Sequence, residues 1–208
     1  MKLFWTAKTR SSRAVWMLEE LGVDYDLETV DIRSDGREDS AEFRAASPMG
    51  KVPALEDGDV KMAESAAICL YLADRYGAGD LAPAIDDAER GRFLYWLMYT
   101  PAVIEPAMAE KSSKTEPHRG RNGWGDFDSM IATFEAGLEG NTWILGDKFT
   151  AADVMLGSSV VFLRMFGMLA DSPLLEAYAD RCLARPAYQK AMSWKTKNNR
   201  IFSGLEIT

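Results

Sequence analysis

Two blocks of sequence are the most informative, Ser47-Pro48-Met49-Gly50-Lys51-Val52-Pro53-Ala54-Leu55 and Met62-Ala63-Glu64-Ser65-Ala66-Ala67-Ile68. Between them lies the turn Asp57-Gly58-Asp59, which is flanked by the β-forming residues 52–56 and 60–62. An Asp-Gly turn between two such runs predicts a β-hairpin. Residues 64–76 carry apolar side chains at helical spacing, so we expect a helix to follow the hairpin directly.

Working outward to the N-terminus, strand and helix signals alternate. Residues 2–6 predict a strand and residues 12–21 a helix that ends at Gly22, in the position where glycine often ends helices. Residues 25–32 predict a half-exposed strand, and residues 40–46 a short helix. The expected order is therefore β-α-β-α-β-β-α, an α/β domain with a mixed four-stranded sheet and helices on its faces.

The pattern changes after the glycine-rich linker at residues 77–83. From there on the sequence predicts helices alone, at residues 88–109, 127–138, 151–166, 174–182 and 186–194. Pro101 should kink the first of them, and residues 195–208 form a polar tail. We therefore expect an α/β domain at residues 1–78 followed by an all-α domain at residues 84–208.

Composition and charge exclude several functions. The net charge of the 208 residues is −8 and there is no basic cluster, which argues against nucleic acid or anionic lipid as a partner. The most apolar segment, residues 154–163, is too short to span a membrane. His118 is the single histidine, and the two cysteines, Cys69 and Cys182, form neither a disulfide framework nor a metal cluster. We expect a cytoplasmic protein without a metal.

The two blocks also have a chemical meaning. A cis Val52–Pro53 bond would cost only about 0.5–1 kcal/mol and would turn the Val52 N–H and C=O outward toward a peptide-like ligand. Glu64 and Ser65 open a helix, whose free N–H groups favour a carboxylate, while Glu64 can accept a hydrogen bond from an ammonium. Together they suit an amino-acid head group. The structural alternatives are a proline at a strand entry and an ordinary helix cap.

The same two blocks, at this spacing, strongly resemble the N-terminal domain of cytosolic glutathione S-transferases, whose fold is thioredoxin-like. Phe149-Thr150-Ala151-Ala152-Asp153 resembles the capping motif of the central C-terminal helix of that family. The resemblance covers nearly the whole chain and leaves the transferase class of this bacterial-type sequence open. It implies a thioredoxin-like glutathione-binding domain at residues 1–78 and a helical bundle that lines the second-substrate site at residues 84–208.

Within the first domain, the resemblance implies glutathione as co-substrate. Glu64 and Ser65 would hold its γ-glutamyl end, and Val52 its cysteinyl backbone. The complete set of expected glutathione-binding residues is Arg10, Lys51, Val52, Pro53, Glu64 and Ser65.

A hydroxyl group is expected to stabilise the thiolate, and the candidates are Thr9, Ser11 and Ser12. In the tyrosine classes the activating residue lies where this chain has Trp5, and an ungapped match places the cysteine of the bacterial class at Arg10. In the serine classes the hydroxyl precedes an Arg-x-Val anchor, and counting back from Arg13-Ala14-Val15 leads to Thr9. Ser11 and Ser12 stay open as alternatives, as does the absence of any side-chain activator.

The second substrate is expected to be an apolar electrophile. Its candidate contacts are Trp96, Tyr99, Ile104, Trp124 and Phe166. We therefore expect a cytoplasmic, homodimeric glutathione transferase with a role in detoxification. The alternatives are a non-catalytic transferase-like protein that binds ligands or other proteins, and a glutathione-dependent reductase or isomerase.

Overall fold

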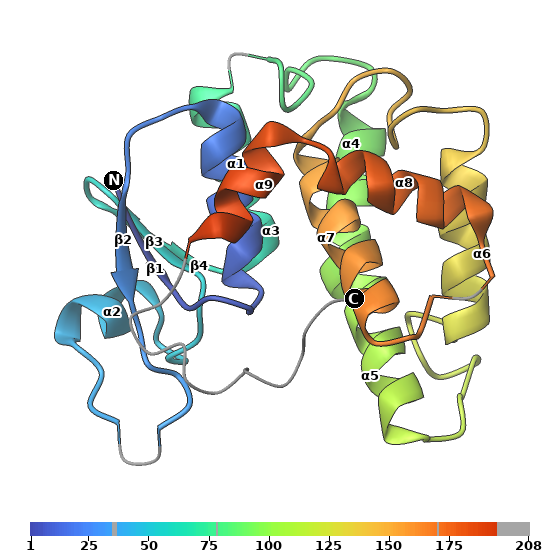
Figure 1. Cartoon of the computed structure of the whole chain (residues 1–208), viewed down its shortest axis with the longest axis horizontal. Helices are drawn as coiled ribbons and strands as arrows, with labels where there is room; N and C mark the ends of the chain where they lie inside the picture. Colours follow the sequence, from blue (N-terminus) through green and yellow to red (C-terminus); the bar gives the residue numbers. More distant parts are fainter. Residues whose placement is uncertain (35–36, 78, 170, 195–208) are drawn as a thin grey trace. The chain divides into compact units, whose positions relative to one another are not determined.

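A computed structural model describes residues 1–34, 37–77, 79–169 and 171–194 (Figure 1). The described residues form two compact units: residues 1–68 together with 186–194, and residues 69–185. The polar tail that we expected at 195–208 lies outside the described residues. None of the described helices is long and apolar enough to cross a membrane.

The first unit contains the predicted mixed four-stranded sheet. Its strands are β1 (Lys2–Trp5), β2 (Asp26–Thr29), β3 (Ala54–Asp57) and β4 (Val60–Ala63), in the spatial order β2-β1-β3-β4. The β1–β2 pair is parallel, and the other two pairs are antiparallel. The strand expected at residues 25–32 is shorter than predicted, because β2 pairs only along the four residues of β1.

Four helices accompany this sheet. They are α1 (Ser11–Leu21), α2 (Ala41–Ala46), the first turn of α3 (Ser65–Tyr76), and α9 (Pro186–Ser193). Phe43 of α2 packs on Phe4 of β1, with ring centroids 5.5 Å apart. Ala54 is buried in the same cluster, and Val52 and Ala63 pack against it. This core fixes the ends of β3 and β4 relative to β1.

Helix α9, which we assigned to the second domain, packs with α1 in the first unit (Figure 1). Tyr188 meets the buried ring of Trp16 edge-on, with centroids 4.9 Å apart. The carboxylate of Glu19 pairs with Lys190 at 2.6 Å and accepts a hydrogen bond from Trp194 Nε1 at 3.2 Å. Burial raises the pKa of Glu19, but the hydrogen bonds from Lys190, Tyr25 and Trp194 outweigh it, so the pKa lies below its usual value. Helix α9 thus covers apolar surface of α1 that the sheet does not bury.

The second unit is helical, as predicted. Its elements after α3 are α4 (Arg90–Tyr99), the π-helical turn η1 (Thr100–Ile104), α5 (Glu105–Ser113), α6 (Phe127–Leu138), α7 (Ala151–Met165) and α8 (Pro173–Leu183). The helix expected at residues 88–109 is interrupted at Pro101, inside η1. Proline lacks the N–H that the helix needs at this point, so the hydrogen-bond pattern widens by one residue.

Helix α7 is buried over most of its length, and the predicted capping box is present at its start. The Asp153 carboxylate accepts hydrogen bonds from the backbone N–H of Thr150 and of Ile144, each at 2.9 Å. Tyr178 of α8 donates its hydroxyl to the same carboxylate at 2.8 Å. Burial raises the pKa of Asp153 to about 6, against the effect of these hydrogen bonds. Asp153 therefore ties α7, α8 and the preceding loop together.

Candidate functional site

The strand registers bring three of the predicted segments to one end of the sheet. Phe4, near the end of β1, pairs with Ala54 at the start of β3. Ala54 in turn pairs with Ala63 at the end of β4. The loop that follows β1, the dipeptide that precedes β3 and the helix start that follows β4 therefore lie at the same sheet end. These are the segments that contain Thr9, Val52–Pro53 and Glu64–Ser65.

The Val52–Pro53 peptide bond is cis. Val52 is half-buried and packs against the Phe4–Phe43 cluster, while Lys51 beside it is exposed. Among the described residues, no partner for the Val52 N–H or C=O is found. An antiparallel strand partner could therefore pair with this backbone.

The chain enters α3 through an unusual backbone conformation. Glu64 has φ +72°, in the left-handed region that residues other than glycine seldom adopt, and its C=O accepts the hydrogen bond of Ile68 N–H at 2.9 Å. Such outliers persist where the surrounding structure holds them, often at binding sites. The Glu64 side chain is exposed and Ser65 is buried to 8% exposure. No hydrogen bond or ion pair of the Glu64 carboxylate or of the Ser65 hydroxyl is found within the described residues.

The three candidate hydroxyls differ in how the loop after β1 uses them. Ser11 is fully buried, and its Oγ accepts from Thr6 N–H at 3.1 Å and donates to Thr6 C=O at 2.8 Å. Thr9 is half-buried; its Oγ1 donates to Thr6 C=O at 2.7 Å and lies 2.7 Å from Ser11 Oγ. Ser12 is also half-buried and donates to Thr9 C=O at 2.8 Å. Ser11 can satisfy the Thr6 carbonyl alone, so Thr9 can turn its proton elsewhere. Arg10, which precedes α1, is exposed.

The five residues predicted for the second substrate fall into two groups. Trp96, Tyr99 and Ile104 are buried, and the Tyr99 hydroxyl donates to Met130 C=O at 3.0 Å. The Trp96 ring occupies the place that a Cβ of Gly137 would take, at 2.2 Å. These three side chains are thus part of the helical core.

Trp124 and Phe166 make up the second group. Trp124 is half-buried, whereas Phe166 at the end of α7 is 66% exposed and stacks on Phe162 with centroids 6.3 Å apart. Aromatic surface is therefore open to a ligand at Phe166.

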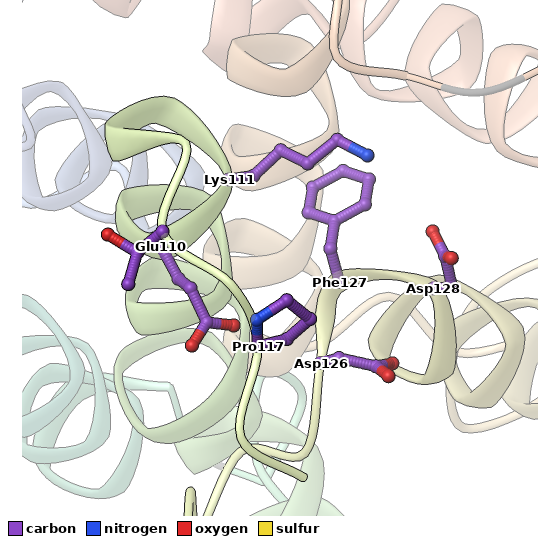
Figure 2. Close-up of a pocket in the computed structure, with 7 residues that line it drawn as sticks. Glu110, Lys111, Pro117, Asp126, Phe127 and Asp128 are labelled. Carbon is purple, nitrogen blue, oxygen red and sulfur yellow. The ribbon is translucent and has the colours of Figure 1, made fainter.

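A small pocket of about 140 Å³ lies between the end of α5 and the start of α6 (Figure 2). Figure 2 shows Lys111 reaching over the ring of Phe127, with its Nζ 4.9 Å from the ring centroid. Asp126 pairs with Arg119, which together with two hydrogen bonds from Ser129 holds the pKa of Asp126 well below its usual range. None of the predicted site residues lines this pocket, and it is smaller than the pockets of about 300–1,000 Å³ that usually hold small-molecule ligands.

The described part of the chain holds no group of three or more His, Cys, Asp or Glu side chains that could bind a metal ion. Sequence reasoning did miss one charged group at the sheet end. Arg37, Asp39 and Arg44 surround the loop before Val52, and the guanidinium of Arg37 donates to Gly50 C=O at 2.6 Å. The contact between Arg37 and Gly50 joins residues 13 positions apart, so the sequence around either residue does not predict it.

Comparisons with known proteins identify the family. Residues 9–75 match the glutathione S-transferase N-terminal domain, and residues 105–181 match the C-terminal domain of the same family. A glutathione S-transferase of Hypomyces subiculosus is 32% identical over 99% of this chain and 93% of its own length.

Solved structures are similar over the same extent. A glutathione transferase of Methylococcus capsulatus has a TM-score of 0.78 and 30% identity, covering 92% of this chain and 97% of that protein. A sphingomonad glutathione S-transferase in complex with glutathione has a TM-score of 0.76 and 28% identity, covering 93% of this chain and 98% of that protein. On both domain matches and on relatives that span nearly the whole chain, this protein belongs to the glutathione S-transferase family.

Proposed function

We propose that this transferase binds glutathione at the sheet end formed by Val52–Pro53 and Glu64–Ser65. The observation that carries the proposal is a pair of polar side chains at a helix start, for which no partner is found among the described residues, next to a backbone that is open for pairing. Ser65 and the N-terminus of α3 suit the α-carboxylate of the γ-glutamyl end, and Glu64 suits its ammonium. Lys51, Pro53 and Arg10 complete the proposed site from the same sheet end.

Thr9 is the hydroxyl that we propose as the donor to the glutathione thiolate. A thiol titrates near pH 8.5, and one good hydrogen bond to its charged form, with the start of a helix nearby, favours the thiolate at neutral pH. Ser11 is buried and its hydroxyl already bonds the backbone of Thr6, so we assign it the role of holding the loop in place. Ser12 stays the alternative donor. The bound thiolate then attacks an electrophile, with positioning and hydrogen bonding as the main sources of acceleration.

The second substrate that we propose is an apolar electrophile, which the helical unit would contact through Phe166 and Trp124. The exposed aromatic surface of Phe166 supports this, since an apolar ligand gains by covering it. The buried side chains of Trp96, Tyr99 and Ile104 would support the substrate site through packing, without touching the substrate. A cytoplasmic location and a role in detoxification complete the proposal.

Ser65→Ala should raise the KM for glutathione by roughly tenfold, the loss of about 1.5 kcal/mol that a hydrogen bond to a charged group contributes. The KM for the electrophile should stay unchanged. Steady-state kinetics with glutathione varied at saturating electrophile measure this effect. Ser113→Ala, which changes an exposed serine of α5, is the matched control and should behave like the wild type. If Ser65→Ala and Glu64→Ala both leave glutathione affinity unchanged, the proposed site is wrong.

We also propose a two-fold homodimer. Phe93, Trp96 and Leu97 on α4 are buried, yet Tyr95 and Met98 on the same helix are 53% and 38% exposed. A second copy would cover this additional apolar surface, and closed dimers are the commonest soluble assembly.

Sedimentation at micromolar protein concentration should therefore give about twice the chain mass of 23.1 kDa. Tyr95→Glu places a charge in the proposed interface and should shift the protein toward the monomer, whereas Met192→Glu, which changes an exposed apolar residue of α9, serves as a control. A wild-type species of 23.1 kDa that still conjugates glutathione would contradict the dimer.

A further inference from the structure

The loop between α2 and β3 is held from outside by two arginines. Arg37 donates from Nη2 to Gly50 C=O at 2.6 Å, and Arg44 donates from Nη1 to Pro48 C=O at 3.1 Å. Both arginines pair with one carboxylate, that of Asp39, at 3.2 Å for Arg37 Nε and 2.6 Å for Arg44 Nη2. The Asp39 side chain is only 3% exposed. We name Arg37, Asp39 and Arg44 the arginine clamp.

The loop backbone is shaped to receive this clamp. Gly50 has φ +64°, and a Cβ at this position would lie 2.8 Å from Arg37 Nη2 and 2.9 Å from Arg44 Cζ. Glycine thus serves both the left-handed turn and the close approach of the two guanidinium groups. From the inner side, Ser47 Oγ closes the same loop by donating to Lys51 C=O at 2.8 Å and accepting from Lys51 N–H at 2.9 Å.

The consequence concerns the next residue, Val52. The clamp and Ser47 engage polar backbone groups of Pro48, Gly50 and Lys51. The chain then reaches Val52 with its direction set and with its own N–H and C=O open within the described structure. Hydrogen bonds to ionised donors are about twice as strong as neutral ones, and the planar guanidinium fixes their direction. The clamp can therefore define the orientation of Val52 before a ligand arrives.

We propose that the arginine clamp is a positioning unit for glutathione: Asp39 orients Arg37 and Arg44, and these hold the loop that presents the Val52 backbone to the cysteinyl part of the tripeptide. The inference rests on the proposed placement of glutathione at Val52. It adds that residues without contact to glutathione affect its binding, because they hold the loop that contacts it. Preorganising a binding backbone increases affinity mainly by removing the cost of ordering it.

The direct test is Arg37→Met, which keeps an unbranched apolar stem and removes the guanidinium with its donors. The KM for glutathione should rise about fivefold or more, as expected for the loss of one charge-assisted hydrogen bond. The kcat at saturating glutathione and the KM for the electrophile should not change. Asp39→Asn should act in the same direction, because it leaves both guanidinium groups without their shared carboxylate. Lys61→Met, which removes a positive charge on β4 away from the loop, is the control and should have no effect.

Hydrogen–deuterium exchange of the free enzyme gives an independent readout. Backbone amides of residues 47–53 should exchange faster in Arg37→Met than in the wild type, while peptides of the helical unit should not change. Arg37→Lys keeps the charge, but its single ammonium cannot hold both Asp39 and Gly50, so it should restore part of the affinity. Unchanged exchange at residues 47–53 in Arg37→Met would overturn the clamp.

An alternative is that Arg37 binds the glycyl carboxylate of glutathione directly. Glutathione amidated at that carboxylate separates the two cases. A clamp predicts the same fold-increase in KM for both ligands on Arg37→Met, whereas a direct ion pair predicts an increase for glutathione alone and would overturn our inference. If Ser65→Ala raises the KM but Arg37→Met does not, the clamp fails while the glutathione site stands. If neither variant changes the KM, the site itself fails.

Discussion

Thr9→Val should raise the pKa of the bound glutathione thiol by about 1–2 and lower turnover at neutral pH by roughly tenfold or more, since one hydrogen bond to a charged acceptor contributes about 1.5–3 kcal/mol. Valine keeps the shape of threonine and removes the donor. As the thiol pKa rises above the assay pH, the thiolate fraction falls in proportion, so the loss of turnover should shrink as the pH increases. Titration of the thiolate absorbance in the complex measures the pKa directly.

Three variants control this experiment. Thr9→Ser keeps the hydroxyl and should retain most of the activity. Ser12→Ala changes a neighbouring half-buried hydroxyl and should leave the thiol pKa unchanged. Ser11→Ala removes the group that bridges both backbone polar atoms of Thr6, so it should lower stability more than it alters the titration. A Thr9→Val complex that titrates like the wild type, while Ser12→Ala shifts the thiol pKa, would show that we assigned the wrong hydroxyl.

Asp153→Ala should lower the free energy of unfolding by about 3 kcal/mol or more, because each buried donor left without an acceptor costs about 1–3 kcal/mol. The variant leaves the N–H groups of Ile144 and Thr150 and the Tyr178 hydroxyl without their carboxylate. It also removes the cap of the most deeply buried helix of the second unit. Urea unfolding monitored by circular dichroism measures the loss.

Two further variants, Tyr178→Phe and Asp128→Ala, serve as controls for this measurement. Tyr178→Phe removes one of the donors to Asp153 and should cost less than Asp153→Ala, since the carboxylate keeps its backbone partners. Asp128 is an exposed acid in the first turn of α6, and Asp128→Ala should change stability little. Our account of Asp153 fails if Asp153→Ala unfolds at the same urea concentration as Asp128→Ala.

Much of the fold could be predicted because its signals are local. The Asp57-Gly58-Asp59 turn sets the hairpin, and Gly58 adopts φ +61° as such a turn requires. Pro101 interrupts its helix because proline has no N–H, whatever surrounds it. The pair Thr150 and Asp153 caps α7 through contacts three residues apart. Each of these features depends on a few neighbouring residues and can therefore be predicted from the sequence.

Other features depend on residues far apart in the chain. Helix α9 packs on α1 across more than 160 positions, and its amphipathic pattern is equally suited to a helical bundle. The difference between Thr9 and Ser11 is one of burial, because only the folded loop places Ser11 between the two polar atoms of Thr6. Both carry a hydroxyl, so sequence spacing cannot rank them.

Sequence alone was enough to predict the order of strands and helices, the Val52–Pro53 dipeptide as a candidate contact, and Glu64–Ser65 as a helix start, since bond chemistry and short-range periodicity govern all three. The folded structure was needed to show that Trp96, Tyr99 and Ile104 are buried in the core, and that Arg37, Asp39 and Arg44 meet at Gly50. The physical reason is that burial and long-range ion pairs depend on which surfaces the packed sheet and helices bring together, and residue type alone leaves that choice open.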